Sequence, residues 1–128
     1  MTPATDDDPY YRAFRGNFTS LLSWRQLDEF WDEVRRIAGS GWYVYAVGEA
    51  VPQQVVGEEE VKRFVDHVDA LLRKEHDEEY CGIVYADSRT HPTFIKIFDP
   101  NNLGVACGYS DNPPLPGWVM SLLPPKEL

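Results

Sequence analysis

The chain has 128 residues, of which 21 are acidic and 12 basic, so its formal net charge is −9 at pH 7. This length fits one domain, and the hydrophobic (43%) and aromatic (13%) content is too high for intrinsic disorder. The negative charge disfavours nucleic acids and anionic membrane surfaces, because both are bound mainly through Lys and Arg. The same charge would attract cationic ligands or basic proteins.

The distribution of apolar and charged residues predicts a cytoplasmic protein. The longest apolar runs, 42–47 and 118–123, are much shorter than the roughly 20 residues of a membrane-spanning helix. Three aspartates at 6–8 stand where a secretion signal would be basic and then apolar. Two cysteines, Cys81 and Cys107, are too few for a disulfide framework.

The N-terminal segment divides into a tail and the start of the fold. Residues 1–9 are polar and acidic, and we expect a flexible tail there, followed by a single α+β domain over 10–128. Aromatic side chains recur at spacings of three and four over 10–18, which predicts a short helical turn that packs onto the domain.

Two amphipathic helices are predicted next. Ser23 and Gln26 form a capping-box pattern, and apolar residues then recur at spacings of three and four over 24–38. A second apolar stripe runs over 61–72, with three glutamates at 58–60 before it and basic residues after it. These charges complement the helix dipole at both ends.

Short apolar runs bounded by turn residues predict about five strands. They are 42–47, 80–86, 93–98, 104–109 and 118–122. The last four follow one another through short connections, which favours antiparallel neighbours. We therefore expect an α+β fold, with two amphipathic helices packed on one face of a mainly antiparallel, meander-like sheet.

The expected meander suggests where a binding site would lie. Successive loops of a meander alternate between the two ends of the sheet, so loops 87–92 and 109–117 should share one end. Polar and aromatic side chains gather there, and loops on a rigid sheet commonly carry function. The candidate binding residues are Asp87, Arg89, His91, Tyr109, Ser110, Asp111 and Trp118.

The same geometry weakens the case for cysteine or metal chemistry. With about 4.8 Å between strands and about 3.3 Å per residue, the Cα atoms of Cys81 and Cys107 would lie about 14 Å apart. A disulfide requires roughly 4.4–6.8 Å. His91 would face Asp111 rather than Cys107, which leaves that thiol without a nearby base. The spacing of His and Cys matches no zinc pattern, and no cofactor-binding motif is present, so we expect no metal and no cofactor.

Three functional hypotheses follow. The preferred one is a non-catalytic protein-interaction or accessory module, because no catalytic motif is found and aromatic residues are abundant. The first alternative is a small-molecule-binding protein or small enzyme, whose site would be concave and would lie at the end of the sheet formed by the two loops. A further alternative is an acidic inhibitor of a basic partner, which requires acids gathered on one face. The sequence does not determine the oligomeric state.

Overall fold

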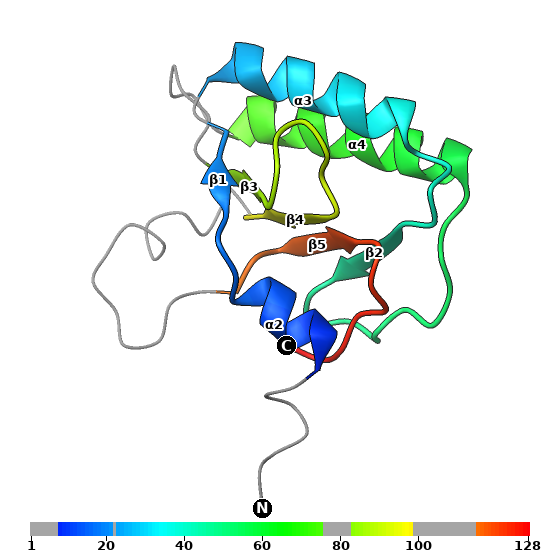
Figure 1. Ribbon diagram of the computed structural model, residues 1–128. Helices are drawn as coiled ribbons and strands as arrows, with labels where there is room; N and C mark the ends of the chain where they lie inside the picture. Colours follow the sequence, from blue (N-terminus) through cyan, green and yellow to red (C-terminus); the bar gives the residue numbers. More distant parts are fainter. Residues whose placement is uncertain (1–7, 22, 76–82, 99–114) are drawn as a thin grey trace, which may run out of the picture.

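The computed structural model describes residues 8–21, 23–75, 83–98 and 115–128, and Figure 1 shows how their elements are arranged. In chain order, the helices and strands of these residues are α2 (Pro9–Phe14), β1 (Thr19–Ser20), α3 (Trp24–Arg36), β2 (Tyr43–Ala46), α4 (Glu58–Glu75), β3 (Val84–Ala86), β4 (Phe94–Ile97) and β5 (Trp118–Ser121).

The strands form one five-stranded sheet in the order β1-β3-β4-β5-β2, and every neighbouring pair is antiparallel. The predicted α+β class with an antiparallel sheet is therefore confirmed, and β3, β4 and β5 lie next to one another in that order. The set of strands in the sheet differs from the prediction in two ways. The two-residue strand β1 was not expected, and the predicted strand 104–109 lies outside the described residues.

The direct pairing of β4 with β5 overturns the predicted grouping of loops. Phe94 pairs with Ser121 at one end of the two strands, and Ile97 pairs with Trp118 at the other. The 87–93 connection leaves at the first end, whereas residues 115–117 enter β5 at the second, where the Gly117 amide donates to the Ile97 carbonyl at 2.9 Å. The prediction that loops 87–92 and 109–117 share one end is wrong for 115–117. The prediction places the strand 104–109 between two strands that are in fact neighbours.

Both long helices begin as the sequence predicts. The Gln26 amide donates to Ser23 Oγ at 3.0 Å, which confirms the predicted cap of α3. The helix ends at Arg36, two residues earlier than predicted, because Ile37 leaves helical geometry. Helix α4 spans Glu58–Glu75, with acidic residues in its first turn and basic residues in its last.

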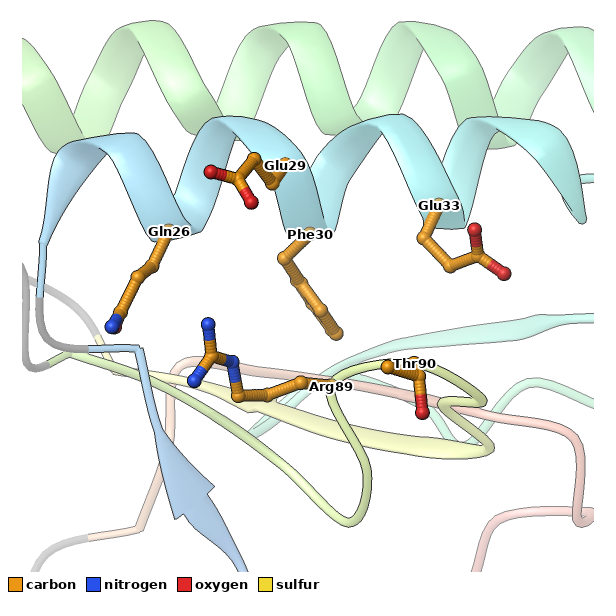
Figure 2. A pocket seen from close by; sticks show the side chains of 6 residues that line it. All are labelled: Gln26, Glu29, Phe30, Glu33, Arg89 and Thr90. Atoms are coloured by element: carbon orange, nitrogen blue, oxygen red, sulfur yellow. The ribbon is translucent and has the colours of Figure 1, made fainter.

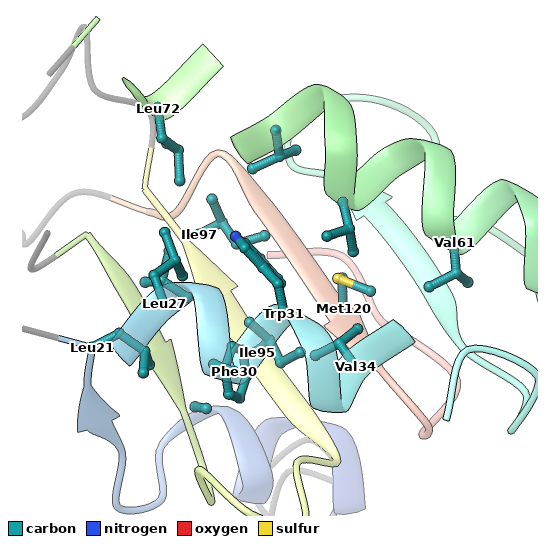
Figure 3. Packing of buried hydrophobic residues seen from close by; sticks show 14 of the residues in the cluster. Leu21, Leu27, Phe30, Trp31, Val34, Val61, Leu72, Ile95, Ile97 and Met120 are labelled. Atoms are coloured by element: carbon teal, nitrogen blue, oxygen red, sulfur yellow. The ribbon is translucent and has the colours of Figure 1, made fainter. Parts of the chain in front are cut away.

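The main core lies between the two long helices and the sheet. Figure 1 shows α3 and α4 side by side on the same side of the sheet, and an ion pair of 2.8 Å between Arg35 and Asp66 joins them. Trp31 of α3 is buried among strand residues such as Ile97 and Met120 (Figure 3). One buried cluster therefore unites side chains of both helices with those of the strands.

A second, aromatic layer covers the opposite face of the sheet. Phe94 of β4 is 1% exposed, and its ring centroid lies 5.2 Å from that of Tyr10, 6.2 Å from that of Phe14 and 5.8 Å from that of Phe18. Lys96 Nζ lies 4.1 and 4.0 Å from the centroids of Phe14 and Phe18, which are cation–π contacts. Burial raises the pKa of the Tyr10 hydroxyl. The predicted helical turn therefore exists as α2 and closes this side of the fold.

Within the described part of the chain, no helix is both long enough and apolar enough to cross a membrane.

Candidate functional site

A concave region of about 420 Å³ lies between α3 and the loop that joins β3 to β4 (Figure 2). We call it the α3–loop groove. It is lined by Gln26, Glu29, Phe30, Glu33, Arg89 and Thr90.

The helix wall of the groove is one face of α3. Its four lining residues follow one another at spacings of three, one and three, which places them on the same side of a helix. Phe30 is 2% exposed and also belongs to the main core, so the base of the groove is anchored to the folded interior. Glu29 is exposed, and Glu33 is partly exposed.

The loop wall is held in shape by its own hydrogen bonds. Asp87 Oδ1 accepts from the Thr93 amide at 2.9 Å and from the Phe94 amide at 3.1 Å, and Asp87 Oδ2 accepts from the Thr93 hydroxyl. Ser88 Oγ accepts from the His91 amide at 3.0 Å. These bonds order the backbone on both sides of Arg89, which faces α3 in Figure 2.

The two acids of the groove differ in their surroundings: Glu33 is stabilised in its ionised form, and Glu29 remains exposed to water. Hydrogen bonding from Arg36 has the largest effect and lowers the pKa of the Glu33 carboxyl; desolvation opposes it, and the positive charges of Arg36 and His91 lower the pKa further. Glu29 Oε1 lies 3.5 Å from Arg25 Nε in an exposed ion pair. A general acid or base usually has its pKa moved towards neutrality, whereas that of Glu33 moves away from it. The groove therefore suits electrostatic binding better than proton transfer.

The opposite wall supplies positive charge. Arg89 is exposed, and it forms no ion pair with any residue that the structure describes. Exposed His91 stands next to this wall, with its Nδ1 3.1 Å from Thr90 Oγ1. The groove thus combines negative charge on the helix wall with positive charge on the loop wall.

Of the seven residues that the sequence grouped together, the structure describes four and separates Trp118 from the other three. Arg89 lines the groove and His91 lies beside it. The Asp87 carboxylate is engaged by three donors of its own loop, which makes it a structural group of the loop wall. Trp118 begins β5 at the opposite end of the sheet from this loop and packs against the main core. The remaining candidates, at 109–111, lie outside the described residues.

Sequence reasoning missed the entire helix wall. Gln26, Glu29 and Glu33 flank the apolar stripe of α3, where polar residues are normally solvated, and Phe30 is one of the apolar residues of that stripe. The spacing of these residues shows that they share a face of the helix. It carries no information about which loop that face meets, so no sequence signal pointed to the groove.

A smaller concave region of about 230 Å³ lies between the start of α2 and the C-terminal segment, and Asp8, Tyr10 and Lys126 are among its lining residues. Among the described residues, no group of three His, Cys, Asp or Glu side chains could hold a metal ion. Cys81 and Cys107 lie outside the described residues, so the predicted separation of their Cα atoms stays a prediction.

Comparisons of this chain with models of protein families, with curated proteins and with solved structures find no match.

Proposed function

We propose that this protein is a non-catalytic interaction module, and that the α3–loop groove binds a charged segment of a partner protein. The observation that carries the proposal is that residues of opposite charge line the two walls of one groove, with Glu29 and Glu33 on α3 and Arg89 on the loop. Complementary charges across an interface set orientation and speed association.

The lining of the groove favours a protein segment over a small organic molecule. Small-molecule sites are mostly apolar and bury most of the ligand surface. The lining here is open to water, because Glu29, Arg89 and Thr90 are exposed and only Phe30 is almost fully buried. An open groove leaves much of its occupant in water, as at the rim of a protein interface.

The order of the loop wall is a second argument for recognition. The hydrogen bonds of Asp87 and Ser88 fix the backbone that carries Arg89 before any partner arrives. Binding to a preorganised loop loses less conformational entropy than binding to a loop that must first become ordered.

The test is affinity purification from cytosol with the full chain and two charge-reversal variants, followed by quantitative mass spectrometry. Arg89→Glu reverses the positive charge of the groove. Arg15→Glu makes the same change at the exposed C-cap of α2, away from the groove residues. We expect a partner that the wild type and Arg15→Glu recover equally and that Arg89→Glu recovers at least tenfold less. Recovery that is independent of Arg89 would refute the proposal.

The small-molecule alternative keeps one supporting observation, which is the volume of about 420 Å³. Ligand pockets commonly have volumes of about 300–1,000 Å³. Screening metabolite pools against the wild type by thermal shift, with Arg89→Glu as the insensitive control, would test it.

The acidic-inhibitor alternative receives less support. Acids on α3 and α4 are interleaved with basic residues in ion pairs such as Glu58–Lys62 and Asp69–Arg73, rather than gathered on one uncompensated face. The cytoplasmic location and the absence of nucleic-acid partners stay predictions from composition.

A further inference from the structure

We infer that the α3–loop groove recognises a single carboxylate on the partner segment, that Arg89 is its anchor, and that a basic residue beside this carboxylate faces Glu29. This inference rests on the proposed function and adds the chemical class of the group that is bound.

Among the described residues that line the groove, Arg89 is a cation whose charge is available. Glu33 is already paired with Arg36, and Glu29 lies 3.5 Å from Arg25 in an exposed pair. Arg89 lines the groove without an ion-pair partner among the described residues. An incoming anion at Arg89 therefore breaks no ion pair that the structure shows.

The geometry of the Arg89 guanidinium group suits a carboxylate. Its planar fork matches the two oxygens of a carboxylate, and such charge-assisted pairs are roughly twice as strong as neutral hydrogen bonds. In Figure 2 the guanidinium of Arg89 extends from the loop towards α3 on the side of Gln26. An anion bound there lies inside the groove rather than on the outer surface of the loop.

The groove favours an anion with a single negative charge. Glu29 and Glu33 stand on the opposite wall, and the chain carries a net charge of −9. Each additional negative charge on the ligand increases its repulsion from these groups. A dianionic phosphate is therefore disfavoured relative to a monoanionic carboxylate, although the guanidinium could pair with either.

Glu29 is available to a basic group that lies beside the bound carboxylate on the partner segment. The side chain of Glu29 is 65% exposed, and its contact with Arg25 is long and solvated, so a cation from the partner can compete for it. A ligand that carries a carboxylate and a basic group side by side satisfies both walls of the groove. An isolated acid satisfies only Arg89.

The experiment titrates the ¹⁵N-labelled full chain with blocked tetrapeptides, acetyl-Gly-Lys-Glu-Gly-amide and its versions with glutamine or phosphoserine in place of glutamate. A further pair, acetyl-Gly-Lys-Gly with a free carboxylate or an amide at its end, separates a side-chain carboxylate from a C-terminal one. Amide shifts in 26–33 and 88–91 are followed in the wild type, in Arg89→Gln and in the control Arg15→Gln.

We expect the glutamate peptide, the free-carboxylate peptide or both to bind at least tenfold more tightly than the counterparts that lack the carboxylate and than the phosphoserine peptide. Tenfold corresponds to about 1.4 kcal/mol, the lower end for a hydrogen bond to a charged group. Arg89→Gln should abolish this preference, and Arg15→Gln should retain it. A glutamine peptide that binds equally well, a tighter phosphoserine peptide, or no shift with any peptide would overturn the inference.

These outcomes separate the inference from the proposed function. If no peptide shows a carboxylate preference but a partner is still recovered in an Arg89-dependent way, only the carboxylate inference fails. If partner recovery does not depend on Arg89, the proposed function fails as well.

Discussion

Replacing Asp87 should destabilise the loop wall of the groove. The loss in free energy of unfolding should depend on which of the two carboxylate oxygens the new side chain lacks. Oδ1 accepts from the amides of Thr93 and Phe94, and Oδ2 accepts from the Thr93 hydroxyl. Hydrogen bonds contribute about 0.5–1.5 kcal/mol each, and values near the lower end apply here because Asp87 is exposed. Asp87→Ala should therefore lower the free energy of unfolding by about 2 kcal/mol.

Asp87→Asn provides the matched comparison. Asparagine keeps an oxygen at the Oδ1 position and so retains the bonds from both backbone amides, while it loses the acceptor for the Thr93 hydroxyl. Its cost should stay below about 1 kcal/mol, and Thr93→Val, which removes only that hydroxyl, should cost a similar amount.

Urea unfolding followed by tryptophan fluorescence measures these differences, provided that the slope of free energy against urea is the same in all variants. The reasoning is refuted if Asp87→Asn destabilises the protein as much as Asp87→Ala. The negative charge, rather than the acceptor at Oδ1, would then hold the loop. A cost below about 0.5 kcal/mol for Asp87→Ala would show that the loop keeps its shape without this side chain.

Three further predictions address the rest of the fold. Phe94→Ala removes the centre of the aromatic layer on the second sheet face, and it should destabilise by about 3–5 kcal/mol in chemical unfolding; a loss under about 1 kcal/mol would contradict the packing described. Ser23→Ala removes the acceptor of the Gln26 amide and should cost about 1 kcal/mol, whereas Ser23→Asp should retain most of the stability. Burial lowers the pKa of Lys96, so the unfolded chain binds more protons than the folded protein between the two pKa values. The stability of the wild type relative to Lys96→Met should therefore rise between pH 7 and pH 10, and a relative decrease would refute the assignment.

The helices show how far local patterns reach. Spacings of three and four within 24–38 and 61–72 are a property of each segment alone, and α3 and α4 lie where those spacings predict them. The cap at Ser23 is equally local, since the atoms that it joins are three residues apart.

The sheet shows where those patterns stop. Strand character at 93–98 and 118–122 was readable from composition, and so was the antiparallel pairing of β3 with β4, but the pairing of β4 with β5 was not. A strand can pair with any other that presents unpaired backbone groups, so the choice depends on the packing of the whole chain. Because the prediction put the wrong strand beside β4, it placed residues 115–117 at the wrong end of the sheet.

The amino-acid sequence by itself determined the class of fold, the two amphipathic helices, the acidic character and the loop that carries Arg89, because each depends on neighbouring residues. Only the tertiary structure decided that this loop faces Glu29 and Glu33 of α3, and that residues 115–117 lie at the other end of β4 and β5. That contact joins segments more than 50 residues apart. It exists because the common core of helices and sheet positions both, and no local spacing encodes it.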